Sequence, residues 1–322
     1  MKQWTIDEAL TLSKIPLFDL IFQARNVHAQ HHNAQEVEIA TLCSIKTGSC
    51  PEDCKYCPQS AHYNTGLKKE PLMDKEEILS NAKKAQETGA TRFCMGAAWR
   101  KLHKKDTEYM CDIISSVKAL GIETCATFGT LDAEQAVSMK DAGLDYYNHN
   151  LDTSEEFYSK IITTRPYQER LDTLKYVADA GINICCGGIV GMGETFEDRL
   201  KMMITLSNLE KQPDSIPINM LVKVKGTPLE NAKNIDSFEY IRLVAITRIM
   251  FPKAFVRLSA GRVNMSEEMQ AMCFMSGANS IFYGDKLLTT ENNDSNTDLE
   301  LLKRLDLKQM KKPLNNQLES NH

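Results

Sequence analysis

A chain of 322 residues with 42% hydrophobic and 25% charged residues has the length and composition of a soluble globular protein with a sizeable core. Its formal net charge of -5 and the lack of a basic stripe argue against nucleic acid as the main partner. No stretch approaches the ~18 apolar residues of a membrane span. The first residues match neither a secretory signal nor a transit peptide, so we expect a cytoplasmic protein with no membrane partner. In that reducing compartment, ten cysteines indicate metal binding or catalysis rather than disulfides.

The chain divides into three segments by pattern. Residues 1–35 are predicted to be helical and to pack against the main body. Residues 36–290 repeat one junction, in which an amphipathic helix ends at a glycine and a short apolar strand follows. Residues 291–322 are mostly polar and are expected to form a partly ordered tail with one short helix near 299–305. The glycines expected to close helices in the left-handed conformation are Gly89, Gly121, Gly143, Gly181 and Gly277.

Eight apolar runs in the middle segment are candidate strands, and helices separate them. This alternation predicts right-handed βαβ units and a parallel sheet. Eight units favour an α/β fold of the (β/α)8 TIM-barrel type over an open doubly wound sheet, and the active site of such a barrel lies at the carboxyl ends of its strands. The runs cover residues 36–45, 92–97, 122–129, 145–150, 182–191, 215–224, 254–261 and 279–284.

A cysteine motif follows the first predicted strand directly. In GSCPEDCKYCPQSAH, residues Cys50, Cys54 and Cys57 have C-x3-C-x2-C spacing. Two prolines in this run oppose a regular helix, so we expect the three thiols to converge from a loop. Cysteine thiolates are the usual ligands of iron–sulfur clusters, and three ligands leave one iron of a four-iron cluster open for catalysis. The alternative is a zinc ion completed by a distant cysteine or by His62, although structural zinc sites usually contain C-x2-C pairs.

Three further cysteines, Cys94, Cys125 and Cys185, lie at or near the ends of predicted strands, and Arg257 lies on another strand. Each cysteine alone is typical of a small buried core residue. Three of them on barrel strands, together with an inward-directed arginine, favour a second cluster inside the barrel. Residue chemistry assigns Arg257 as a counter-ion to that cluster, because arginine is effectively always protonated.

Strand alternation also predicts which neighbours of these residues face elsewhere. Cys186 follows Cys185 on an extended strand and is expected to point away from the barrel interior. His149 alternates with Asn148 and Asn150 and is expected to be a structural histidine with satisfied hydrogen bonds. The remaining cysteines are expected to fill packing positions, namely Cys43, Cys111 and Cys273.

The motif C-x3-C-x-aromatic-C, with Tyr56 as the aromatic residue, resembles that of radical S-adenosylmethionine enzymes. The resemblance implies a [4Fe–4S] cluster on Cys50, Cys54 and Cys57, whose open iron binds the methionine part of S-adenosylmethionine (SAM). It also implies that an electron from this cluster cleaves the sulfonium and gives a 5′-deoxyadenosyl radical.

Longer segments are similar to the biotin synthase family, from the first helix to about residue 305. This resemblance implies that Cys94, Cys125, Cys185 and Arg257 hold a [2Fe–2S] cluster, with the arginine as a ligand. It also implies that this cluster is the source of the inserted sulfur. The matching segments are GSCPEDCKYCPQSAHYNTGL, FCMGAAWR, ETCATFGTL, YYNHNLDTS, YQERLDTL, GGIVGMGE, IPINMLV and VRLSAGR.

The same resemblance assigns ligand contacts to residues after several predicted strands. An asparagine both donates and accepts hydrogen bonds, which suits a cyclic urea, and a carboxylate suits a ribose diol. The implied SAM contacts are Tyr56, Ala97, Asn150, Asp152 with the ribose, Arg170 with the methionine carboxylate, and Ile189 beside the adenine. The implied dethiobiotin contacts are Asn148, Asn150, Asn219, Thr289 and Thr290.

The implied activity is radical insertion of sulfur into dethiobiotin to form biotin, a sulfurtransferase reaction that is the last step of biotin biosynthesis. The implied partners are dethiobiotin, a flavodoxin or ferredoxin as electron donor, and a second copy of the chain in a homodimer. Two other interpretations stay open. One is a different enzyme of the superfamily, either a lipoyl synthase, which needs a further Cys-rich motif, or a hydrogenase maturase. The other is a non-catalytic protein that binds a metal through its cysteines.

Overall fold

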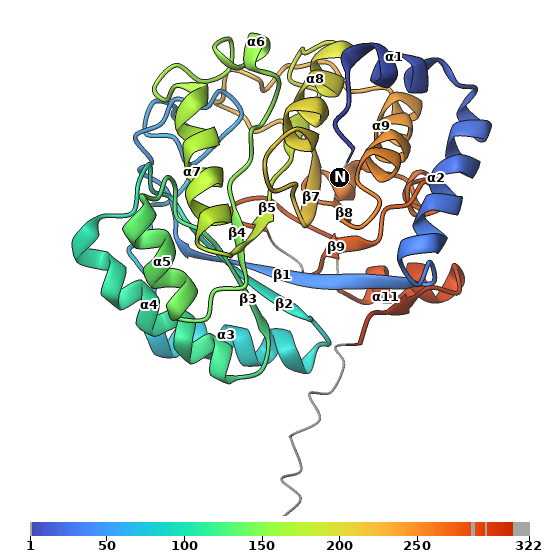
Figure 1. The fold of residues 1–322 in the computed structure, drawn as a ribbon. Helices are drawn as coiled ribbons and strands as arrows, with labels where there is room; N and C mark the ends of the chain where they lie inside the picture. The colour runs from blue at the N-terminus through green and yellow to red at the C-terminus, as the bar shows by residue number, and fades with distance from the viewer. Residues whose placement is uncertain (1, 285–286, 294, 312–322) are drawn as a thin grey trace, which may run out of the picture.

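Parallel strands close into a barrel, and helices cover its outer surface (Figure 1). The computed structural model describes residues 2–284, 287–293 and 295–311. Neighbouring strands follow the order β1-β2-β3-β4-β5-β7-β8-β9, and pairing of β9 with β1 completes the ring. The predicted (β/α)8 barrel is therefore confirmed, and each of the eight predicted runs supplies one of its strands.

Two further strands lie outside this ring. β6 follows β5 in the chain and pairs with β7, and β10 pairs in parallel with β1. The strands are β1 (Glu36–Lys46), β2 (Arg92–Ala97), β3 (Glu123–Thr127), β4 (Tyr146–Asn148), β5 (Asn183–Cys185), β6 (Gly188–Val190), β7 (Ser215–Met220), β8 (Phe255–Leu258), β9 (Ser280–Phe282) and β10 (Lys308–Gln309). The helices are α1 (Ile6–Lys14), α2 (Leu17–His31), α3 (Lys75–Glu87), α4 (Lys104–Ala119), α5 (Ala133–Asp141), α6 (Glu155–Tyr158), α7 (Tyr167–Asp179), α8 (Phe196–Ser207), α9 (Ser237–Met250), α10 (Glu267–Met275) and α11 (Ser295–Arg304), with a 3-10 turn η1 (Arg262–Asn264).

The glycines predicted to end helices do adopt the left-handed conformation. Gly277 shows why glycine is required, because its φ is 100° and an added β-carbon would lie 2.5 Å from Cγ of Arg248. The other four have φ values of 90°, 85°, 95° and 73° at Gly89, Gly121, Gly143 and Gly181.

The buried residues form two compartments on opposite sides of the sheet. A large apolar core lies between strands and helices and includes Val37 and Ile39 of β1. A small inner cluster includes Ala40 of the same strand together with Cys94 and Cys125. Since neighbours on a strand face opposite sides, the inner cluster is the barrel interior. Barrel interiors are usually filled by Val, Ile and Leu, so thiols in this position indicate a functional centre.

The terminal segments pack onto the outside of the barrel. Helix α2 lies against α9 (Figure 1), and Arg242 of α9 donates to the carbonyl oxygens of Ser13 and Ile15 at 3.0 and 2.6 Å. At the other end, Asp298 of α11 forms a buried ion pair of 2.6 Å with Arg262.

The short helix expected near 299–305 is thus α11, which begins four residues earlier. Residues 312–322 of the expected tail lie outside the described residues, and the three-way division at residues 35 and 290 stays a prediction. Within the described part of the chain, no helix is long and apolar enough to cross a membrane.

Candidate active site

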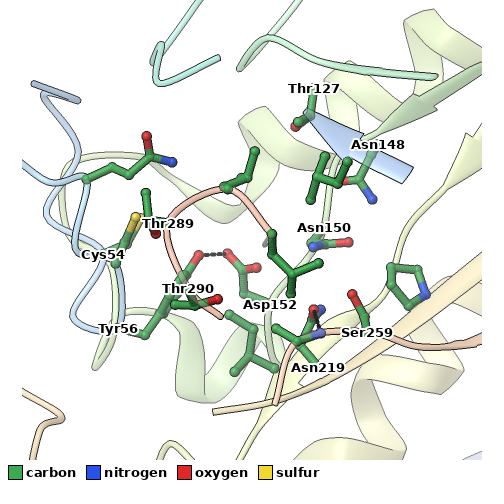
Figure 2. A pocket seen from close by; sticks show the side chains of 18 of the residues that line it. Cys54, Tyr56, Thr127, Asn148, Asn150, Asp152, Asn219, Ser259, Thr289 and Thr290 are labelled. Carbon is green, nitrogen blue, oxygen red and sulfur yellow. Dashed lines mark hydrogen bonds between the residues drawn. The ribbon is translucent and has the colours of Figure 1, made fainter. Parts of the chain in front are cut away.

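A pocket of about 330 Å³ opens where the barrel strands end. Residues at the carboxyl ends of β2, β4 and β7 line it, namely Ala97, Asn148 and Asn219. Both predicted cysteine groups border the same space, the first through the loop after β1 and the second through Cys94 and Cys125. Figure 2 views this pocket, with Cys54 on one side and Asn148 on the other. The pocket thus lies at the carboxyl ends of the strands, where the sequence analysis placed the active site of such a barrel.

The cysteine loop after β1 is held in shape by its own backbone. Cys50 donates its amide to the Gln59 carbonyl at 2.9 Å and accepts from the Ala61 amide at 2.7 Å. Cys57 donates to the Cys54 carbonyl at 2.9 Å. Burial raises the pKa of all three thiols, to about 12 for Cys57. A bound cation would reverse this, because a coordinating thiol loses its proton.

Two acidic residues of the motif anchor this loop to the segment between α6 and α7. Glu52 forms ion pairs with Arg100 at 2.6 Å and with Arg165 at 3.2 Å. Asp53 accepts hydrogen bonds from Thr163 and Thr164. The Glu52 side chain is only 5% exposed, and these ion pairs offset the cost of burying its carboxylate. The sequence analysis assigned no role to either residue.

The zinc alternative would require His62 or a distant cysteine as a ligand beside the three thiols. A zinc ion requires ligand atoms about 2.0–2.3 Å from one point. Among the described residues, no three His, Cys, Asp or Glu side chains meet closely enough to hold one metal ion. His62 is exposed, and its Nε2 lies 3.0 Å from the Pro51 carbonyl oxygen.

The second cysteine group lies inside the barrel. Cys94 and Cys125 are register partners on β2 and β3, and both belong with Cys185 to the inner cluster. The Asn148 amide donates to the Cys185 sulfur at 3.2 Å. The hydrogen bond from Cys125, followed by the positive charge of Arg257, lowers the pKa of Cys185. The barrel therefore brings together three thiols that lie far apart in the sequence.

Arg257 reaches the same space from β8 and is completely buried. Its Nε donates to Oγ of Ser280 at 2.7 Å, and its Nη2 donates to Oε2 of Glu38 at 2.8 Å. Nη1 has no hydrogen-bond partner among the described residues. A buried donor without a partner is costly, so this nitrogen is a candidate ligand atom.

Sequence reasoning missed two charged residues that surround Arg257. Glu38 of β1 is 1% exposed, and Arg92 of β2 is completely buried. Arg92 binds Glu38 at 3.1 Å and stacks with its Cζ 3.4 Å from the ring centroid of Tyr146. The available signal was position: Glu38 shares its strand face with Ala40 and Leu42, both of which border the barrel interior.

The expectation for Cys186 is confirmed. Cys185 belongs to the inner cluster, whereas Cys186 belongs to the apolar core between strands and helices. The three cysteines expected to be packing residues also lie in or against that outer core, namely Cys43, Cys111 and Cys273.

The residues predicted to contact SAM form a connected polar group at the pocket. Arg170 binds Asp152 at 2.7 Å and donates to the backbone oxygen of Asn150 at 2.6 Å. Tyr56 donates to Oδ2 of Asp152 at 2.8 Å, a contact drawn in Figure 2. Asp152 has a φ of 69°, and a non-glycine residue in this region often marks a functional site. Ala97 and Ile189 line the same pocket.

The residues predicted to contact dethiobiotin also line the pocket. Asn219 is held by the backbone, donating to the Gly188 oxygen at 3.0 Å and accepting from the Ala260 amide at 3.2 Å. Thr289 and Thr290 approach from the loop after β9 (Figure 2). Asn148 and Asn150 border the pocket from the end of β4.

The expectation for His149 was wrong. His149 is one of the residues that line the same pocket as Asn148 and Asn150, and its Nε2 has no hydrogen-bond partner among the described residues. The reason is that β4 ends at Asn148, so strict alternation stops before His149. Burial, and then the charges of Arg170 and Arg165, hold the pKa of this imidazole well below its ordinary value.

Comparison with known proteins agrees with this architecture. Residues 44–206 match the model of the radical SAM superfamily, and residues 217–308 match the biotin and thiamin synthesis associated domain. Solved structures share the fold at low identity. A methylornithine synthase has a TM-score of 0.81 at 18% identity, over 96% of this chain and 95% of that structure. The hydrogenase maturase HydG of Carboxydothermus hydrogenoformans has a TM-score of 0.81 at 17% identity, over 96% and 76%.

The fold and the site together define a radical SAM enzyme. Biotin synthases of Yersinia pestis (strain Pestoides F) and Yersinia pseudotuberculosis (serotype O:1b) are each 60% identical to this chain over 304 residues, which is 94% of this chain and 88% of each relative. The chain belongs to the biotin synthase family. Membership implies SAM and iron–sulfur clusters as cofactors.

Proposed function

We propose that this chain converts dethiobiotin to biotin by radical insertion of one sulfur atom. The reaction removes one hydrogen from the methyl carbon and one from the side-chain methylene next to the ureido ring, and it forms two carbon–sulfur bonds. The observation that carries the proposal is the barrel interior, where Cys94, Cys125, Cys185 and Arg257 replace the usual aliphatic filling beside the pocket.

Cys50, Cys54 and Cys57 would hold a [4Fe–4S] cluster in this proposal. Their chemistry fits, because three thiols on one loop border the pocket and leave one iron without a protein ligand. Cys94, Cys125, Cys185 and Arg257 would hold a [2Fe–2S] cluster, and the unpartnered Nη1 of Arg257 fits a fourth ligand. When bound, the first cluster and SAM supply a radical that removes hydrogen from unactivated carbon, and the second cluster supplies sulfur.

The protein's own residues orient the two small molecules. Asp152 would accept from the ribose hydroxyls of SAM, and Arg170 would bind its methionine carboxylate; both are buried charges that already face the pocket. Tyr56, Ala97, Asn150 and Ile189 would complete the SAM contacts.

Dethiobiotin would lie beside SAM. Asn150 would contact both molecules, and Asn219 would bind the ureido ring, since one donor and one acceptor site of its amide remain after its two backbone bonds. Asn148, Thr289 and Thr290 would bind the substrate carboxylate.

The proposal extends to partners and location. The reductant would be a flavodoxin or ferredoxin, the active form a homodimer and the compartment the cytoplasm. Residues 1–35 would act as a helical extension, 36–290 as the catalytic barrel and 291–322 as a tail.

An anaerobic assay for biotin tests the proposal. The chain is reconstituted with iron and sulfide and supplied with SAM, dethiobiotin and a reductant. Formation of biotin, with two clusters per chain, is the expected result. Zinc without sulfide would contradict the proposal. A single cluster that persists after careful reconstitution would instead favour an enzyme of the maturase kind.

A further inference from the structure

A carboxylate lies inside the barrel between two guanidinium groups. Glu38 binds Nη2 of Arg257 at 2.8 Å and Nη2 of Arg92 at 3.1 Å, and it also contacts the hydroxyl of Ser280. A charge in a barrel interior is costly unless it is paired and hydrogen-bonded. The placement of Glu38 is therefore specific, and its partners indicate what it does.

The two guanidinium groups depend on Glu38 to different degrees. Arg92 has a second carboxylate, Glu123, at 3.2 Å. Arg257 has no carboxylate within ion-pair distance other than Glu38 among the described residues. If Glu38 were removed, Arg92 would keep Glu123 as a counter-charge, whereas Arg257 would lose the carboxylate that pairs with it.

Glu38 and Ser280 together fix the orientation of the Arg257 side chain. Because the guanidinium is planar with its nitrogens in a rigid fork, holding Nε and Nη2 also fixes the direction of Nη1. The Phe282 ring restricts the group further, with its centroid 4.6 Å from Cζ. Nη1 is the nitrogen left without a partner, and Arg257 borders the same pocket as Cys94 and Cys125.

We propose that Glu38 is a positioning residue for the sulfur-donating site: with Ser280, it holds Arg257 so that Nη1 is presented as the ligand to the [2Fe–2S] cluster. This inference rests on the proposed function, which places that cluster on Arg257 and the three barrel cysteines. Glu38 itself touches neither the cluster nor the substrate.

The test uses E38Q in the reconstituted full-length chain, with E123Q as the matched control. Both substitutions remove a carboxylate from Arg92, but only E38Q removes one from Arg257. Visible absorption and iron content are followed while a chelator removes the clusters. E38Q is expected to release the [2Fe–2S] cluster about tenfold faster than wild type and to shift its absorption bands, with the [4Fe–4S] cluster unaffected. E123Q is expected to behave as wild type.

A double variant separates positioning from general loss of stability. In an R257M background Glu38 has no Arg257 side chain to position, although it still pairs with Arg92, so E38Q should cause no further acceleration. A full additional effect in that background, or equal release from E38Q and E123Q, would overturn the inference. If E38Q does not fold, S280A carries the test by removing the partner of Nε, and a wild-type release rate in S280A would overturn it. If the wild-type protein assembles no second cluster, both the proposed function and this inference are contradicted. If folded E38Q releases the cluster at the wild-type rate, only this inference is contradicted.

Discussion

Tyr56 donates a hydrogen bond of 2.8 Å to Asp152 and so joins the cysteine loop to the segment that follows β4. The same carboxylate pairs with Arg170 at 2.7 Å. One acidic side chain thus connects the proposed SAM ligands to the proposed cluster loop, and its removal has a specific expected effect.

Asp152→Asn is expected to weaken SAM binding by roughly ten- to a hundredfold, because a hydrogen bond to a charged group contributes about 1.5–3 kcal/mol. Asparagine tolerates the left-handed backbone that Asp152 adopts, so the substitution changes charge without adding strain. Equilibrium dialysis of labelled SAM with reconstituted protein measures the effect. The control is Asp145→Asn, which removes the ion-pair partner of Lys118 just before β4. This variant should bind SAM normally. Equal affinity of wild type and Asp152→Asn would contradict the assignment.

Cys185 and Cys186 offer a matched pair of substitutions on one strand. Cys185→Ala should abolish both the second cluster and biotin formation while reductive cleavage of SAM continues. Cys186→Ala should retain biotin formation and reductive cleavage of SAM. It should lose about 1 kcal/mol of unfolding free energy, since it removes a small buried side chain from the outer core. Iron analysis, a biotin assay and urea unfolding are the measurements. Loss of the second cluster in Cys186→Ala would show that the two thiols have exchanged roles.

The Arg262–Asp298 ion pair is expected to hold α11 on the barrel. Both side chains are 1% exposed, and Asp298→Asn leaves a buried guanidinium without its counter-charge. Breaking such a pair costs about 3–5 kcal/mol of unfolding free energy. The control is Glu267→Gln, which breaks an exposed pair with Arg304 and should cost less than ~1 kcal/mol. Denaturant unfolding of both variants provides the comparison, and similar losses would argue against a stabilising role for the buried pair.

Acid should destabilise the fold through His28. Burial, and then the charge of Arg248, lowers the pKa of His28 from 6.5 to about 3. Its folded pKa lies below its unfolded value, so the unfolded state binds the proton first and stability falls as the pH drops below about 6.5. Between pH 6.5 and pH 5 this residue should account for about 2 kcal/mol. His28→Phe keeps a buried ring without the titration, and unfolding measured across this range should show a shallower slope. An unchanged slope would contradict the assignment.

The fold and the first cysteine group were predictable because their signals are local. Strand alternation and helix-ending glycines need only a short window of sequence, and the spacing of Cys50, Cys54 and Cys57 is visible in eight consecutive residues. The placement of Cys185 and Cys186 on opposite faces follows from the same alternation.

The inner face of β1 could indicate the side on which Glu38 lies, but the partners of Glu38 were not predictable, because they lie far apart in the sequence. Glu38 alternates with apolar residues on β1, a pattern that also suits a solvent-facing position. Its burial follows only from closure of the barrel, which brings Ser280 to it across 242 residues. In the same way, Asp298 lies in a polar segment of the sequence, and nothing in that segment indicates a buried ion pair with Arg262. His149 was misjudged because a three-residue strand is too short for alternation to persist.

The pairing of β1 with both β9 and β10 has a consequence for biosynthesis. β1 is made early, yet both of these partners leave the ribosome late, and Glu38 meets Ser280 only across 242 residues of chain. Contacts of such high sequence separation carry a large loop-closure entropy cost, and folds that depend on them fold slowly. The seam of the barrel can therefore close only after β9 and β10 have been synthesised, and under the proposed function the second cluster would be completed after translation rather than during it.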